Sequence, residues 1–145
     1  MKVLVINGPN INFVGIREKS IYGTRTYDDI CRDLCAYAKE KGVSLEVWQS
    51  NHEGAIIDKI QSIYNSDTDA VIINPGAYTH YSYAIADAIK SVDIPFVEVH
   101  FSDINSREDF RKISVTKPSC AAQICGMGED GYKKALDMIA SGEVK

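Results

Sequence analysis

The sequence predicts an α/β fold in which a five-stranded, doubly wound parallel sheet is covered by helices on both faces. The first observation behind this prediction is a set of short β-branched runs, such as residues 71–73 (VII), which lack the polar alternation of a half-exposed strand. The second is that each run ends in polar or turn-forming residues. The third is that segments with helical spacing separate the runs, and parallel neighbours need such crossover connections.

Five segments are expected to form the strands. The segment 2–6 (KVLVI) is apolar and stops at a turn-forming cluster, Asn7-Gly8-Pro9-Asn10. In 43–47 apolar residues alternate with polar ones, which predicts an edge strand with one wetter face. The remaining expected strands are residues 70–73, 96–100 and 121–125.

Helical segments lie between these strands. Thr26 followed by Asp29 resembles a capping box, apolar residues then recur at helical spacing, and Gly42 marks the end of this first helix. Later helices are expected over 56–64, from about Ser82 to residue 89, and over 132–140, with a short charged helix at 107–112.

At this length the natural arrangement is a flavodoxin-like three-layer sandwich with strand order 2-1-3-4-5. Strands 1 and 3 of that order flank the switch point, where a ligand crevice opens at the carboxyl ends of the strands. The polar side chains that follow strands 1, 3 and 4 should therefore converge on one crevice, namely those of Asn10, Asn74, His80, His100 and Ser102.

Residues 11–26 show neither helical nor alternating periodicity and are expected to form a long loop. Loops longer than about 12 residues in a compact domain are uncommon and usually functional. We interpret this segment as a lid at the crevice.

Composition favours a single domain, residues 1–145, that acts on a small ligand. A formal net charge of −4 and a pI near 5.3 argue against a nucleic-acid partner. No apolar run approaches the roughly 20 residues that span a bilayer, so no membrane partner is expected. The start, Met1-Lys2-Val3, leads into a strand and not into a signal peptide, so a cytoplasmic location is expected.

The cysteines and a glycine-rich segment could suggest a metal site and a dinucleotide site, but neither interpretation is favoured. Cys31, Cys35, Cys120 and Cys125 form no C-x-x-C pair, and buried or partly buried reduced thiols are favoured over a metal site. Residues 126–131 (GMGEDG) match G-x-G-x-x-G, but no further strand follows in which a dinucleotide-binding βαβ unit could continue. A tight turn with a helix start is expected there.

Candidate catalytic residues are found among the histidines. Glu98 precedes His100 by two residues, so both side chains should project from the same strand face, where the carboxylate would orient the imidazole as an acid or base. His80 also follows a buried strand, whereas His52 follows the edge strand and is interpreted as structural or solvated.

The lid contributes a second candidate pair, Tyr22 and Arg17. A nearby guanidinium favours the phenolate form of tyrosine, which could then act as a base. The alternative is that Tyr22 is a packed loop aromatic and Arg17 a solvated charge, and the residues alone leave both interpretations open.

Several motifs taken together closely resemble type II 3-dehydroquinate dehydratases from end to end. They are INGPNIN (6–12), the Arg17 and Tyr22 region, QSNHEG (49–54), INPGAYTH (73–80), VEVH (97–100) and REDFR (107–111). The resemblance implies anti elimination of water from 3-dehydroquinate to 3-dehydroshikimate through an enolate. It also implies a place in the shikimate pathway to chorismate, with no metal and no cofactor.

Each catalytic role follows from a position that matches the family motif. By this resemblance Tyr22 is the base, Arg17 holds it as phenolate, and Asn10 helps to hold a water against the enolate oxygen. His100, oriented by Glu98, is the acid.

The resemblance likewise assigns substrate-binding residues. They are Asn74 at the departing hydroxyl, His80 and Arg111 at the other hydroxyls, Phe101 and Ser102 at the carboxylate, and Asp87 across a subunit interface. It further implies a dodecamer built as a tetramer of trimers.

One rival interpretation is a flavodoxin-like module that binds a phosphorylated nucleotide or a flavin at the same switch point, because one fold hosts many functions. It lacks a phosphate-cradling turn after strand 1, where Pro9 removes a donor. A structural shell protein is a third interpretation, which leaves the convergence of polar residues unexplained.

Overall fold

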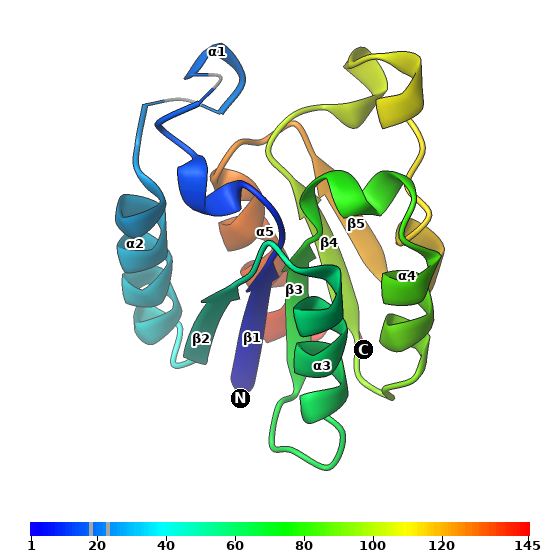
Figure 1. Ribbon diagram of the computed structural model, residues 1–145. Helices are drawn as coiled ribbons and strands as arrows, with labels where there is room; N and C mark the ends of the chain where they lie inside the picture. Colours follow the sequence, from blue (N-terminus) through cyan, green and yellow to red (C-terminus); the bar gives the residue numbers. More distant parts are fainter. Residues whose placement is uncertain (18, 23) are drawn as a thin grey trace.

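The computed structural model describes residues 1–17, 19–22 and 24–145, with the side chains of Ile21 and Tyr22 excluded. It contains a five-stranded parallel sheet in the order β2-β1-β3-β4-β5, as predicted (Figure 1). The expected strand positions are confirmed to within about two residues at each end. The strands are β1 (Lys2–Asn7), β2 (Ser44–Gln49), β3 (Ala70–Asn74), β4 (Phe96–His100) and β5 (Ala122–Cys125).

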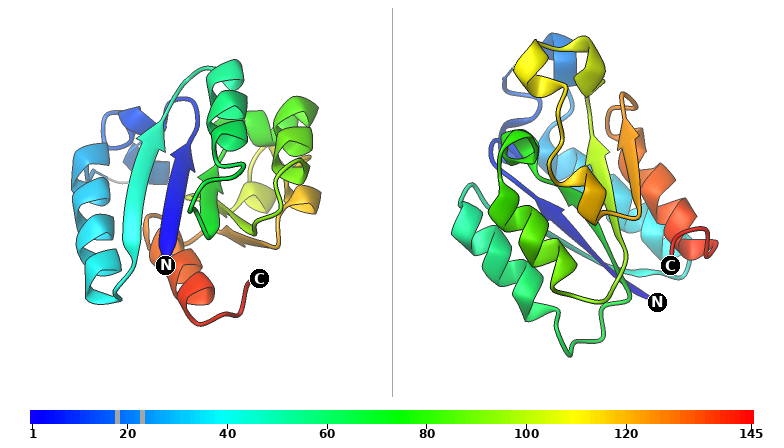
Figure 2. Two further views of the ribbon diagram at one scale, coloured as in Figure 1. Left: turned by 90° about the horizontal axis from the view of Figure 1, so that it is seen from below. Right: turned by 90° about the vertical axis from the view of Figure 1, so that its right-hand side faces the viewer.

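Helices cover both faces of the sheet, which gives three layers (Figure 2). Helices α2 (Tyr27–Glu40) and α5 (Asp130–Ala140) cover one face, and α3 (Glu53–Ser62) and α4 (Tyr83–Lys90) cover the other. The capping box at the start of α2 is confirmed, because the Thr26 side chain accepts from the Asp29 backbone and Asp29 accepts in return. This reciprocal pair fixes where the first long helix begins.

The core is divided into two halves by the sheet, as the unbroken apolar strands predict. Alternate residues of one strand serve opposite halves: Val3 and Val5 pack under α2 and α5, while Leu4 and Ile6 pack under α3 and α4. All residues of β3 and β4 are buried, so these are the interior strands. Close packing of the core holds the carboxyl ends of these two strands in place, and the polar residues of the site follow directly after them.

The described residues of the segment 11–26 lie above the carboxyl ends of the strands (Figure 1). The segment was expected to be an irregular loop, but it contains a 3₁₀ helix, η1 (Ile11–Phe13), and one helical turn, α1 (Lys19–Tyr22). The lack of helical periodicity did not reveal these turns, because short turns depend on local hydrogen bonds, such as Phe13 N to Asn10 O at 3.0 Å, and not on apolar spacing. The charged segment after β4 also forms only a 3₁₀ turn, η4 (Asp109–Arg111).

The glycine-rich turn and the cysteines differ in how well they match the predictions from the sequence. Residues 126–131 form a turn into α5, with Gly126 at φ 78° and Gly128 at φ 56°. The cysteines are unpaired, but Cys35 is exposed, contrary to the expectation of buried or partly buried thiols, because it lies on the outer side of α2. Within the described ranges, none of the helices has the length and apolar character needed to cross a bilayer.

Candidate active site

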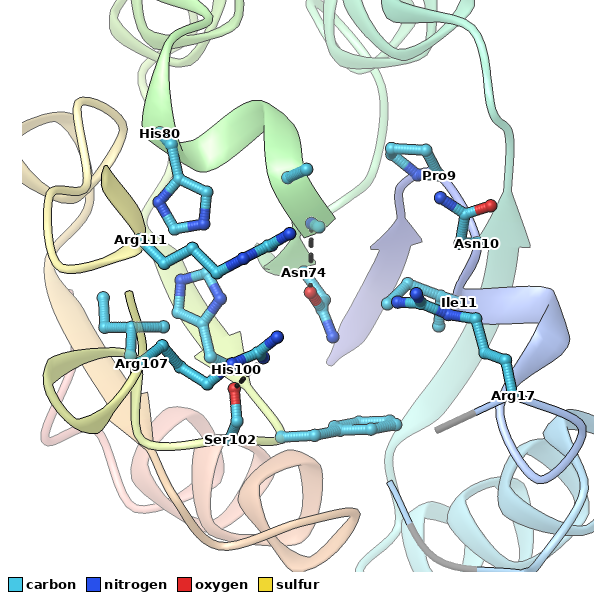
Figure 3. A pocket seen from close by; sticks show the side chains of 14 residues that line it. Pro9, Asn10, Ile11, Arg17, Asn74, His80, His100, Ser102, Arg107 and Arg111 are labelled. Atoms are coloured by element: carbon cyan, nitrogen blue, oxygen red, sulfur yellow. Dashed lines mark hydrogen bonds between the residues drawn. The ribbon is translucent and has the colours of Figure 1, made fainter. Parts of the chain in front are cut away.

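A cavity of about 110 Å³ opens at the carboxyl ends of β1, β3 and β4 (Figure 3). It is the crevice that the strand order predicts, and it combines loops that are far apart in the sequence. Its lining residues are Pro9, Asn10, Ile11, Arg17, Asn74, Gly76, Ala77, His80, His100, Phe101, Ser102, Ile104, Arg107 and Arg111.

Close backbone contact between the loops after β1 and β3 forms one wall of the cavity. The Gly8 N–H donates to the Asn74 carbonyl at 2.7 Å, and a Cβ at Gly8 would lie 2.4 Å from the Pro75 carbonyl oxygen. Gly76, at φ 60°, also packs closely, because a Cβ there would lie 2.9 Å from the Pro9 carbonyl oxygen. Only residues without a side chain allow this approach, which brings Asn10 beside the loop after β3.

Asn74 is fixed in one orientation by contacts on both sides of its amide. Its Oδ1 accepts from the Gly76 N–H at 3.2 Å (Figure 3), and its Nδ2 donates to the Tyr132 hydroxyl at 3.3 Å. Tyr132 in turn donates to Asn7 Oδ1. Because both contacts require the same amide orientation, Asn74 keeps one N–H for a ligand in the cavity.

His100 and Glu98 form the pair that strand alternation predicts. His100 Nε2 lies 3.0 Å from Glu98 Oε2, and the two side chains are almost completely buried. Since Nε2 is engaged with the carboxylate, Nδ1 is the ring nitrogen that can serve a ligand. Glu98 does not line the cavity and lies behind the histidine.

The Glu98 carboxylate accepts from a ring of polar side chains. Thr79 and Thr116 contact Oε1, whereas Ser114 and Gln123 contact Oε2 at 2.9 and 2.6 Å. Burial alone would raise the pKa of Glu98, but the contact with His100 and the hydrogen bonds from Thr116 and Gln123 outweigh it and bring the pKa to about 2. Glu98 is therefore a fixed negative charge behind His100.

His80 also lines the cavity, from the 3₁₀ helix η2 (Gly76–His80). Its Nδ1 donates to the Ile113 carbonyl at 2.7 Å. Burial lowers the pKa of His80, and the charges of His100 and Arg111 lower it further, against the effect of the Ile113 carbonyl. A neutral His80 suits hydrogen bonding to a ligand more than proton delivery.

Three arginines make the cavity cationic although the chain carries a net charge of −4. Arg17 and Arg111 extend toward the cavity from opposite sides (Figure 3). Arg107 donates to Ser102 Oγ at 3.3 Å, and Glu108 pairs with Arg111 at 3.0 Å. This arrangement favours an anionic ligand.

The structure brings most of the predicted residues together. Of the predicted set, Asn10, Arg17, Asn74, His80, His100, Phe101, Ser102 and Arg111 line the cavity. Asp87 does not line it, because it lies exposed on α4. The Tyr22 side chain lies outside the described residues, so its predicted pairing with Arg17 has no structural description.

Sequence reasoning missed Arg107 and the ring around Glu98. Arg107 belongs to the motif REDFR, but a motif gives no direction to a side chain in a loop. No sequence pattern marked Gln123 or Thr116 as a partner of Glu98. Their contacts with it arise from the position of β5 and from the path of the loop before β5. Within the described part of the chain, no cluster of three metal-ligating side chains occurs.

Comparisons with known proteins agree with this geometry. The family model described as "Dehydroquinase class II" matches residues 1–140. The 3-dehydroquinate dehydratase of Lachnoclostridium phytofermentans is 57% identical over 141 residues, covering 97% of each chain. That of Clostridium acetobutylicum is 59% identical over 139 residues, covering 96% of each.

Solved structures show the same relationship. The type II dehydroquinase from Butyrivibrio crossotus is 58% identical, superimposes with a TM-score of 0.95, and the match covers 96% of this chain and 97% of the other. The type II dehydroquinase from Propionibacterium acnes is 41% identical, with a TM-score of 0.93 over 97% of this chain and 96% of the other. The chain belongs to the class II dehydroquinase family.

Proposed function

We propose that the chain is a 3-dehydroquinate dehydratase, a hydro-lyase that converts 3-dehydroquinate to 3-dehydroshikimate in the shikimate pathway. The observation that carries the proposal is the placement of His100, paired with the buried Glu98 behind it, beside three arginines in one crevice. Eliminating water from an anionic hydroxy ketone needs an acid for the departing hydroxyl and cations for the carboxylate. The relatives named 3-dehydroquinate dehydratase support the same assignment.

The reaction is an anti elimination in two steps. A base removes a proton from the carbon next to the ketone, and the electron pair passes to the ketone oxygen as an enolate. The enolate then re-forms the carbonyl while the carbon–oxygen bond to the leaving hydroxyl breaks, and that hydroxyl departs as water with a proton from the acid. An acid and a base of this kind each contribute about two or more orders of magnitude in rate.

In the proposal Tyr22 is the base and His100 the acid. Arg17 holds Tyr22 as phenolate by its positive charge. Glu98 orients His100 and stabilises the imidazolium before it gives up its proton, so the proton is delivered from Nδ1. Asn10, with the backbone near Pro9 and Ala77, holds a water against the enolate oxygen.

The remaining lining residues bind the substrate. Asn74 donates to the departing hydroxyl, and His80 and Arg111 bind the other hydroxyls. Phe101, through its backbone amide, and Ser102 hold the carboxylate. The reaction as proposed needs neither metal nor cofactor.

The proposal extends to the organisation of the protein. Residues 1–145 form one domain, with residues 11–26 as a lid that excludes water and so strengthens the charge interactions in the crevice. The assembly is a dodecamer, a tetramer of trimers, in which Asp87 reaches a neighbouring crevice. The enzyme works in the cytoplasm on a small molecule, without a nucleic-acid or membrane partner.

The direct test is the rise in ultraviolet absorbance from the enone product when purified protein meets 3-dehydroquinate. We expect activity in the parent and losses of at least about a hundredfold in kcat for Tyr22→Phe and His100→Ala. The matched controls are Tyr64→Phe and His52→Ala, which change exposed residues outside the cavity and should retain activity. A folded but inactive parent would contradict the proposed function.

A further inference from the structure

The hydrogen bonds to Glu98 exceed the number that a carboxylate accepts comfortably. A carboxylate offers about four lone-pair directions, two on each oxygen. Among the described residues, five side chains contact Glu98, and three of them share Oε2: His100 at 3.0 Å, Ser114 at 2.9 Å and Gln123 at 2.6 Å. Gln123 therefore competes with His100 for the same oxygen and makes the shorter contact.

This competition has a consequence for the acid. Each donor to Oε2 withdraws electron density from the oxygen that holds the imidazolium. With fewer donors the carboxylate would bind the charged histidine more strongly, and the proton would be released less readily.

We propose that Gln123 is a positioning residue for the dehydration, which acts through Glu98 to limit how firmly His100 holds its proton. The proposal rests on the proposed function, because it assigns a role to Gln123 in the step in which His100 is the acid. Gln123 does not line the cavity and its side chain contacts Glu98, so its influence on a substrate has to pass through the carboxylate.

Other charged groups also face this pair and must stay constant in a test. Arg17, Arg107 and Arg111 share the cavity with His100, as does His80. Burial raises the pKa of Cys120 and of Cys125, and the charge of Glu98 raises both further. A substitution at Gln123 leaves all of these groups in place.

Gln123→Met removes the donor while keeping the length of the side chain. The chain contains three histidines, so their ring protons can be followed individually by NMR during a pH titration. We expect the titration of His100 to move upward by about 0.5 to 1 pH unit, while those of His52 and His80 stay within about 0.2 unit.

Kinetics give a second, independent readout. A more weakly acidic His100 should lower kcat about two- to fivefold and leave KM unchanged, since Gln123 does not contact the substrate. A merely structural role would instead reduce stability or change KM. The matched control is Gln61→Met, at an exposed position on α3, which should change neither the titration nor kcat.

The outcomes separate this inference from the proposed function. An unmoved His100 titration in a folded Gln123→Met protein would overturn the inference even when the parent is active. An inactive parent would overturn the proposed function. The titration needs no substrate, so it would still show whether Gln123 acts on His100. If Gln123→Met fails to fold, Ser114→Ala removes another donor from the same oxygen and must shift His100 in the same direction.

Discussion

Glu98 is the residue whose charge contributes most clearly to both the site and the fold. Its side chain is fully buried, yet its pKa is lowered from 4.5 to about 2. A depressed pKa contributes stability that is present above pH 4.5 and is lost as pH falls toward 2. Folding and catalysis thus depend on the same deprotonated carboxylate.

This linkage predicts a pH dependence of unfolding that Glu98→Gln should remove. Between pH 5 and pH 3 the free energy of unfolding of the parent should fall by about 2 kcal/mol more than that of Glu98→Gln. Urea unfolding at the two pH values measures the difference. The control, Glu40→Gln, changes an exposed residue of α2 and should behave as the parent does. Equal pH dependence in all three proteins would show that Glu98 is not held as a charge.

A contact between two side chains can be predicted from the sequence only when the residues are close together along the chain. The His100–Glu98 pair follows from strand alternation alone, because the partners are two residues apart on β4. Thr116 and Gln123 contact the same carboxylate from 18 and 25 residues away. The distance between such residues is set by a loop without periodicity, so no pattern in the sequence predicts it.

At the scale of elements, the strand order was predictable and the path of the loops was not. Buried β-branched runs and helical crossovers predict a doubly wound parallel sheet. Its natural order at this length is β2-β1-β3-β4-β5, which is the observed order and places the crevice beside β1 and β3. By contrast, the turns η1 and α1 within residues 11–26 are stabilised by short-range backbone bonds, which leave no apolar spacing to detect.

The contact between the loops after β1 and β3 supplies a test at this scale. Gly8→Ala would place a Cβ 2.4 Å from the Pro75 carbonyl oxygen, so the loops must separate. We expect a loss of about 1 to 3 kcal/mol in unfolding free energy and a strong loss of activity, because Asn10 and Asn74 would move apart.

Gly54→Ala is the matched control for this substitution. Gly54 lies in α3, and a Cβ there would meet nothing within 4 Å. This change should stabilise the protein by about 0.5 to 1 kcal/mol without affecting activity. Urea unfolding and the enone assay measure both variants. A Gly8→Ala protein with the stability and activity of the parent would mean that the two loops are not packed against each other as described.

At the scale of the whole molecule, the position of Asp87 links substrate binding to assembly. It lies exposed on α4 and does not line the cavity of its own chain. If it binds substrate, as the resemblance implies, it must do so in a neighbouring subunit. The proposed dodecamer requires a mass in sedimentation of about twelve times the 16.0 kDa of one chain.

Subunit mixing tests whether Asp87 acts across an interface. Asp87→Ala should raise KM about five- to tenfold, because one hydrogen bond to the substrate is lost. It should leave kcat nearly unchanged. His100→Ala should be almost inactive. In oligomers co-expressed from both variants, some crevices combine an intact His100 of one chain with an intact Asp87 of its neighbour. The KM of those crevices should return to that of the parent. A KM that stays at the Asp87→Ala value in mixed oligomers would place the action of Asp87 within its own chain or outside substrate binding altogether.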